Sequence, residues 1–190
     1  MTSVQPVDFL LSRQSVKWVQ GPGPDQEQLD LILRAAMTAP DHGKLRPWRF
    51  TLVTDQAVPR LGELAIQAAQ SAGKPLSPEK EASVRKWLAK VPLLVAMACR
   101  IDHSNTKIPE HERALAVGVA AGNMLNAAHM LGFGAFWSTG LGTYLDEVTE
   151  ALGYDSLDYQ FLGYLAIGTP VAPAEPVVRP DYHEFVKVWK

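Results

Sequence analysis

The stretch from Glu110 to Leu131 constrains the fold more than any other part of this sequence. It contains no proline, and from Ala114 onward it is apolar almost all the way around the helix that it predicts. A helix that is hydrophobic on every side has to be buried centrally. At about 1.5 Å per residue this helix would span roughly 30 Å, which is the width of a small domain.

A chain of 190 residues has difficulty covering such a helix from all sides. Gly118, Ala121 and Gly122 are small, so another helix can approach closely at their positions. A symmetric dimer covers the helix by pairing it with its own copy. The sequence therefore predicts a homodimer with the helix Glu110–Leu131 at the interface.

Composition narrows the class of protein. The formal net charge of −2 argues against a basic nucleic-acid-binding face. The most apolar stretch, residues 114–137, is interrupted by Asn123, Asn126 and His129, which would be costly in a bilayer. The first residues lack the pattern of a signal peptide, and the single cysteine, Cys99, excludes an intrachain disulfide. We therefore expect a cytoplasmic protein that binds neither nucleic acid nor a membrane.

The remaining chain alternates helical patterns with short apolar runs, which is typical of one α+β or α/β domain over residues 1–190. Residues 170–190 contain four prolines and cannot form a long helix, so they are either an extended arm over a neighbouring subunit or a loose terminus. The predicted strands are 48–53, 92–99, 134–138 and 159–167. Besides the long helix, one helix is predicted to end at Arg13 and a second to end before Pro40. Three more are predicted over 57–72, 77–89 and 146–152.

Common nucleotide-binding and metal-binding motifs are missing from the sequence. Gly132-Phe-Gly134 and Gly140-Leu-Gly142 both lack the third glycine of a dinucleotide-binding loop, and there is neither a P-loop nor a His-Glu-x-x-His motif. His103 and His111 have no cysteines nearby and are typical of surface residues, so no metal site is predicted. Cys99 lies at the end of an apolar run, so we expect its thiol to be packed in the interior and chemically inert.

Two polar clusters remain as candidates for a binding site. Arg13, Ser15 and Lys17 alternate after the first helix, and their groups suit a phosphate, although basic residues at a helix end also complement its dipole. The loop 41–46 carries three basic side chains before Trp48. It is either a ligand-binding loop or an ordinary connection whose tryptophan fills the core.

Five short motifs, taken in order, resemble those of the nitroreductase family, in particular its minimal YdjA-like branch. They extend over nearly the whole chain, so coincidence is improbable. The motifs are Arg13-Gln-Ser15, Thr38-Ala-Pro-Asp-His42, Arg46-Pro-Trp-Arg-Phe50, Gly132-Phe-Gly-Ala-Phe-Trp137 and Ile167-Gly-Thr-Pro170.

The resemblance implies a nitroreductase-like α+β fold, in which helices flank a central, mostly antiparallel sheet and the long helix lies at a dimer interface. It also implies a homodimer that binds FMN between its subunits. The first motif would meet the phosphate and the flavin edge, the second would come from the partner subunit, and the residues after Phe136 would line the other side of the ring. The implied cofactor-binding residues are Arg13, Gln14, Ser15, Thr38, His42, Trp137, Ser138 and Thr139.

Some positions depart from the pattern of that branch. Gln14, Thr38 and Ser138 stand where the branch has arginine, and Arg46 stands where it has glutamine. Either Arg46 or Lys17 replaces the lost positive charges, or FMN binds less tightly.

The resemblance further implies that NADH or NADPH reduces FMN, and that a nitroaromatic, a quinone or another electron-poor small molecule is then reduced in a ping-pong hydride transfer through flavin N5. Such chemistry belongs to the cofactor, so no catalytic side chain is predicted. The alternatives are an FMN carrier or sensor without turnover, a cofactor-free helical dimer that serves as an interaction module, and a flavin enzyme of another type, such as a dehydrogenase or a reductive dehalogenase.

Overall fold

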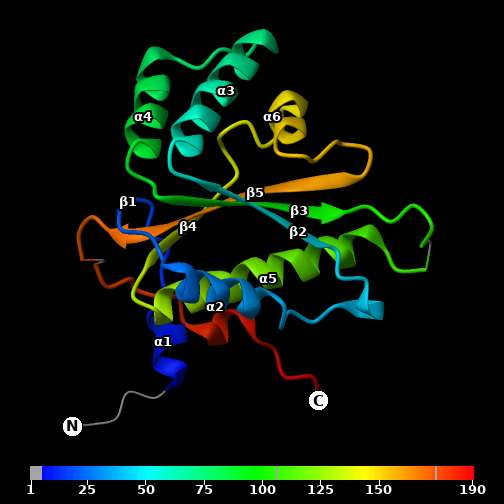
Figure 1. Ribbon diagram of the computed structural model, residues 1–190. Coiled ribbons are helices and arrows are strands. Elements are labelled where there is room, and N and C mark those ends of the chain that lie inside the picture. Colours follow the sequence, from blue (N-terminus) through cyan, green and yellow to red (C-terminus); the bar gives the residue numbers. More distant parts are fainter. Residues whose placement is uncertain (1–5, 106, 174) are drawn as a thin grey trace.

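The computed structural model describes residues 6–105, 107–173 and 175–190, and it confirms the predicted α+β class. One sheet lies between two layers of helices (Figure 1). The layer on one face consists of α3 (Ala57–Ser71), α4 (Pro78–Leu88) and α6 (Asp146–Ala151), and the layer on the other consists of α1 (Pro6–Ser12), α2 (Gln26–Ala36) and α5 (Glu110–Met130).

The sheet is antiparallel at every described pairing, as the resemblance implied. Its strands are β1 (Val19–Gln20), β2 (Trp48–Thr54), β3 (Leu93–Arg100), β4 (Gly134–Ser138) and β5 (Tyr159–Pro170). β3 lies between β2 and β5, and both β4 and β1 pair with the other edge of β5.

The end of β5 corrects the predicted boundary. The strand was expected to end at Ile167, but it continues to Pro170 because β1, which was not predicted, pairs Val19 with Pro170 and Gln20 with Thr169. A two-residue strand carries no pattern of its own in the sequence. Proline is tolerated at the end of a strand, where its missing N–H leaves no gap in the ladder.

The core lies on both faces of β3, whose residues from Leu93 to Cys99 are all buried. Leu94, Ala96 and Ala98 pack under α3 and α4, whereas the alternate residues pack against α2 and α5. This explains why the strand reads as a continuous apolar run.

The start of α2 follows directly from its sequence. The Asp25 side chain accepts a hydrogen bond from the Gln28 backbone N–H at 2.9 Å, and the Gln28 side chain accepts one from the Asp25 backbone N–H at 3.0 Å. This capping box satisfies two N–H groups that the helix leaves free. Ile32 and Ala36 are then buried against the sheet and α5.

The long helix α5 buries only part of its surface in one chain. Val117, Ala121 and Met124 pack inside the core, but Leu115 is 65% exposed, and a Cβ placed at Gly118 or Gly122 would meet nothing within 4 Å. Gly118 and Gly122 lie open, as a close approach by a second helix requires, but Ala121, which was grouped with them, is buried in the core of this chain. Contact of this face with a second copy stays a prediction.

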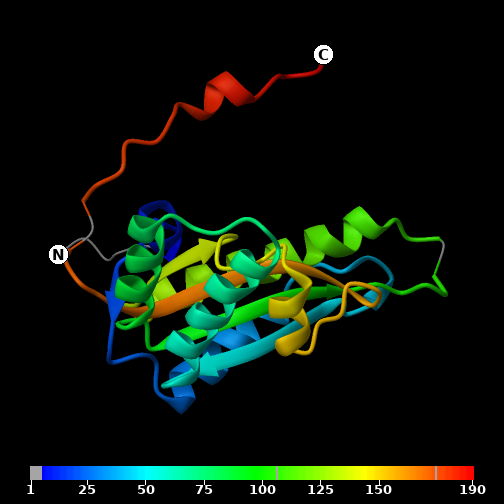
Figure 2. The same cartoon turned by 90° about the horizontal axis from the view of Figure 1, so that it is seen from above.

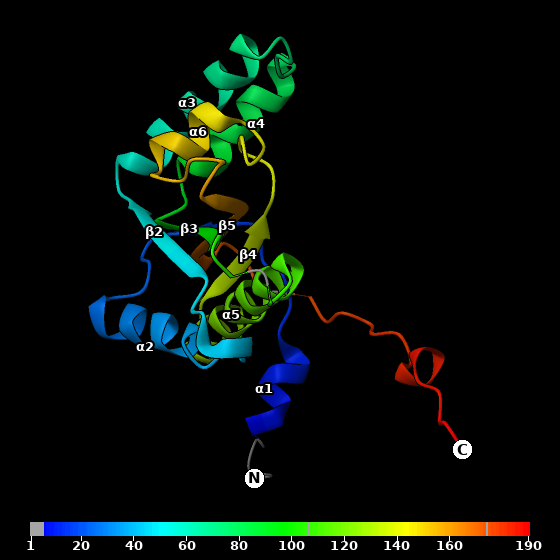
Figure 3. The same ribbon diagram turned by 90° about the vertical axis from the view of Figure 1, so that its right-hand side faces the viewer.

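The C-terminal residues leave the body of the protein and extend outward (Figures 2 and 3). They contain the short 3₁₀ helix η2 (Tyr182–Phe185), and the side chains of Phe185, Val188 and Trp189 are exposed. Among the described residues, no helix is both long and apolar enough to cross a bilayer.

Candidate functional site

The first predicted group, Arg13, Gln14 and Ser15, lies between α1 and β1. The backbone N–H of Val16 donates to the carbonyl oxygen of Ala135 at 2.9 Å, so this segment runs beside β4. β4 ends with Trp137 and Ser138, which belong to the third predicted group. Two motifs that are more than a hundred residues apart in the sequence are therefore neighbours.

A cavity of about 350 Å³, here called the β4 cavity, opens between α4 and the end of β4. Three of the predicted residues, Trp137, Ser138 and Thr139, line it together with Lys17. Arg13, Gln14 and Ser15 are not among its described lining residues. In this chain the C-terminal residues contact them, since Gln14 donates to the carbonyl oxygen of Glu175 at 2.8 Å and Arg179 donates to that of Arg13.

A β-bulge sets the position of Trp137. Met97 pairs with Gly163 and Ala98 pairs with Phe161, which leaves Leu162 as the extra residue of β5. The carbonyl oxygen of Leu162 accepts a hydrogen bond from Trp137 Nε1 at 2.9 Å. Bulges re-aim side chains and are common beside functional sites.

Gly163 allows the close approach of β5 to Ser138. Its φ of +100° lies in a region that L side chains rarely adopt, and a Cβ at this position would overlap the Ser138 carbonyl oxygen. The lining residues Trp137 and Ser138 therefore depend on a glycine that the sequence analysis did not single out.

Lys17 lies at the edge of the β4 cavity, beside two tryptophans. Its Nζ lies 5.5 Å from the ring centroid of Trp18 and 5.8 Å from that of Trp87, within the range of cation–π attraction. Trp87 Nε1 also donates to the Lys17 carbonyl oxygen at 3.0 Å. Of the two candidates to replace the lost charges, Lys17 lines this cavity, and Arg46 does not.

The second predicted group lies on the α5 side of the sheet. Thr38 follows α2, and its hydroxyl donates to the carbonyl oxygen of Ala35 at 2.8 Å and accepts from Asn123 of α5 at 3.1 Å. His42 begins the short 3₁₀ helix η1 (His42–Lys44), and its Nδ1 lies 2.7 Å from a Glu112 carboxylate oxygen of α5. Within one chain, Thr38 and His42 line no part of the β4 cavity.

Arg113 is buried, and the sequence analysis did not single it out. It is only 4% exposed, and its guanidinium donates to the carbonyl oxygens of Asp102, Asn105 and Ile108, at 3.3, 2.6 and 2.9 Å. The polar loop 103–109 is therefore fastened to α5 over its described residues. Arginine in a polar first helical turn is usually exposed, so no signal in the sequence marks this one.

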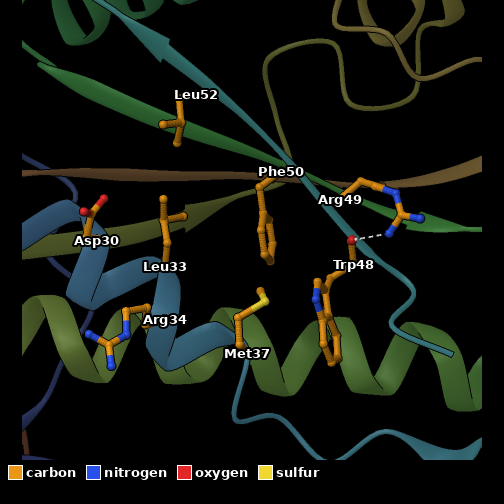
Figure 4. A pocket seen from close by; sticks show the side chains of 8 residues that line it. All are labelled: Asp30, Leu33, Arg34, Met37, Trp48, Arg49, Phe50 and Leu52. Atoms are coloured by element: carbon orange, nitrogen blue, oxygen red, sulfur yellow. Dashed lines mark hydrogen bonds between the residues drawn. The ribbon is translucent and has the colours of Figure 1, made fainter. Parts of the chain in front are cut away.

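A larger cavity, of about 580 Å³, lies elsewhere, along α2 and β2 (Figure 4). Leu33, Met37 and Phe50 point into it, and Trp48, which was expected either to fill the core or to begin a ligand-binding segment, forms part of its wall. None of the predicted cofactor-binding residues lines it. Size alone therefore does not mark the candidate site, and we assign it to the β4 cavity, which three of the eight predicted cofactor-binding residues line.

His103 and Cys99, which the sequence analysis considered, make ordinary contacts within the protein. No group of three or more metal-ligating side chains occurs among the described residues. His103 contacts the carbonyl oxygen of Leu157 at 3.0 Å and the Asp158 carboxylate at 3.4 Å. Cys99 is buried, as expected.

Burial raises the pKa of the Cys99 thiol to about 11, the nearby charges having smaller and opposing effects. We expect iodoacetamide to label Cys99 at pH 8 about a hundredfold more slowly in the folded protein than in urea, since the thiolate is the reacting form. Mass spectrometry of timed samples measures both rates. Equal labelling in the two conditions would contradict the buried, neutral thiol.

Comparison with known proteins places these features in a family. The family model described as the nitroreductase family matches residues 10–169, which contain all the predicted site residues. The chain belongs to the nitroreductase family. Membership confirms the predicted family and the predicted class of enzyme, a nitroreductase-type oxidoreductase.

Individual members of the nitroreductase family agree with this. YdjA of Escherichia coli K12, whose name assigns it provisionally to the NAD(P)H nitroreductases, is 33% identical over 184 residues, with 95% of this chain and 97% of YdjA covered. A nitroreductase-like protein from Bacillus cereus has the same fold, with a TM-score of 0.80, 20% identity, and 100% and 98% of the two chains covered. A nitroreductase from Desulfovibrio desulfuricans, solved in complex with FMN, has a TM-score of 0.75 at 20% identity, with 100% and 99% covered.

Proposed function

We propose that this protein is an FMN-dependent NAD(P)H oxidoreductase that reduces nitroaromatics, quinones or similar electron-poor small molecules. The observation that carries the proposal is the β4 cavity, where Lys17, Trp137 and Ser138 of this nitroreductase-family chain meet. The FMN complex of the Desulfovibrio protein supports the choice of cofactor.

The residues around the cavity suit FMN chemically. Trp137 offers an aromatic surface to a flat ring, and Lys17 offers a positive charge to the ring edge that becomes anionic on reduction. Arg13 and Ser15, on the adjoining segment, are suited to the phosphate. When bound, FMN would supply two-electron hydride chemistry between nicotinamide and acceptor in ping-pong order. The protein's own residues orient the ring and exclude water.

We also propose that the active protein is a homodimer. Thr38 and His42 lie apart from the β4 cavity in one chain, so they can contribute to a flavin site only in a second copy. The exposed apolar face of α5 and the described residues after β5, 171–173 and 175–190, offer two surfaces for the contact. The most exposed large apolar residue is Leu115 on the α5 face and Trp189 in the C-terminal segment.

Absorbance spectroscopy of the purified protein tests the function. We expect a flavin spectrum that NADH or NADPH bleaches and that a nitroaromatic or a quinone restores. Bound flavin that neither nucleotide bleaches would favour a carrier or sensor. A colourless protein that does not take up added FMN would favour a cofactor-free interaction module. Bleaching without reoxidation by either acceptor would point to another flavin reaction.

Replacing the proposed phosphate ligand gives a second test. We expect Arg13→Ala to weaken FMN binding about tenfold to a hundredfold, because a charge-assisted hydrogen bond is lost. Lys86→Ala removes the same charge from an exposed residue that does not line the β4 cavity and is the matched control. Fluorescence titration of the flavin-free proteins measures both affinities. Equal affinity in the two variants would remove Arg13 from the site.

A further inference from the structure

A second cavity adjoins the β4 cavity. It has a volume of about 360 Å³ and lies between α3, the turn before α4, and the loop 139–145; we call it the α3 cavity. Val84, Thr139, Gly140 and Leu141 line both cavities. A molecule in the α3 cavity would therefore lie directly beside the proposed flavin site.

The walls of the α3 cavity are mainly apolar. Ala65, Ile66 and Ala69 of α3 form one side, and Leu76 and Leu145 contribute further aliphatic surface. The small side chain of Ala69 leaves room where a larger residue would fill the space. Concave apolar sites of a few hundred cubic ångströms are typical of small-molecule binding.

One cation accompanies this apolar surface. Lys74 is the one charged side chain among the described residues that line the α3 cavity, and it is exposed to solvent. A ligand with an apolar ring and one acidic group would match the cavity, with its ring against α3 and its acid near Lys74. A neutral ring compound would gain the apolar contacts alone.

The loop that closes the α3 cavity is held in place. The Thr143 hydroxyl donates to the carbonyl oxygen of Gly140 at 2.6 Å, and the Tyr164 hydroxyl donates to that of Leu141 at 3.2 Å. Gly142 has a φ of +71°, and a Cβ there would crowd Val148. A wall that is already ordered loses little entropy when a ligand binds.

We propose that the α3 cavity binds aromatic acids and is the entry site for acceptors of that class. The binding of aromatic acids is inferred from the α3 cavity alone. Their reduction as acceptors rests on the proposed function, because it requires a redox site in the β4 cavity.

Naphthoate, and naphthamide as its neutral counterpart, test the binding statement by calorimetry on the flavin-free protein. We expect Lys74→Gln to weaken naphthoate binding about two- to fivefold, as for an exposed charge pair, and to leave naphthamide binding unchanged. Lys80→Gln, at an exposed lysine that does not line either cavity, is the matched control and should bind both compounds as the original protein does. Ala69→Phe should abolish the binding of both compounds while the circular dichroism spectrum stays the same.

A Kd for naphthoate above about 1 mM in the original protein would overturn the proposal, and so would equal affinities in the Lys74→Gln and Lys80→Gln proteins.

For turnover, we expect Lys74→Gln to raise the KM of a naphthoquinone sulfonate without changing kcat, and to leave the KM of neutral menadione unchanged. If naphthoate binds as expected but the original protein reduces neither quinone, the proposed function fails and the binding site stands.

Discussion

Gly163→Ala should destabilise the protein by about 2 to 5 kcal/mol, which is a large effect for the addition of one methyl group. A left-handed backbone costs an alanine about 1 to 2 kcal/mol. The new methyl group would also overlap the Ser138 carbonyl oxygen, and forcing atoms into a packed site costs about 1 to 3 kcal/mol more. Urea unfolding followed by circular dichroism measures the loss.

Gly153→Ala is the matched control for this substitution. Gly153 also has a positive φ, of +87°, but a Cβ there would meet nothing within 4 Å, so only the backbone strain of about 1 to 2 kcal/mol should appear. The overlap at Gly163 displaces Ser138, so we also expect Gly163→Ala to retain less FMN than Gly153→Ala. Equal losses of stability would show that the contact between Gly163 and Ser138 is not tight.

Gly118→Arg should convert the proposed dimer to a monomer and thereby remove its flavin. The position is open in one chain, and arginine has a higher helix propensity than glycine, so the folded chain should tolerate it. Two long cations facing each other across paired helices would raise the dimer dissociation constant at least about a hundredfold. Light scattering gives the mass, and absorbance gives the flavin content.

Gln67→Arg is the matched control for charge and size, because Gln67 lies on α3 and is exposed on the far side of the sheet from α5. We expect it to keep the mass and the flavin content of the original protein. A Gly118→Arg protein that stayed dimeric with full flavin would show that α5 is not the contact. A monomer with full flavin would show that one chain completes the site.

Local and periodic features of the sequence predicted most of the architecture. The capping box at Asp25 marks the start of α2, and the unbroken run from Leu93 to Cys99 marks a strand covered on both faces. The surplus apolar surface of α5 marks a face that one chain does not cover. These signals are readable because each depends on neighbours in the chain or on a regular repeat.

The candidate site was predicted only in part. The ordered motifs led to Trp137, Ser138 and Thr139, which line the β4 cavity, and Lys17 was considered both as a phosphate ligand and as a replacement charge. The motifs could not show that Lys17, beside Trp18 and Trp87, is the residue that reaches the cavity, since Trp87 is seventy positions away.

The sequence by itself determined most of the helices and strands, the family, and part of the candidate site, although it did not show β1 or the end of β5. Only the tertiary structure decided how these parts meet: the bulge that offers the Leu162 carbonyl to Trp137, the need for glycine at position 163, and the fastening of the loop 103–109 by Arg113. The physical reason is that each of these contacts joins backbone atoms to a distant side chain or a neighbouring strand. Backbone carbonyl groups are the same in every residue, so the sequence does not show which one is left free to accept.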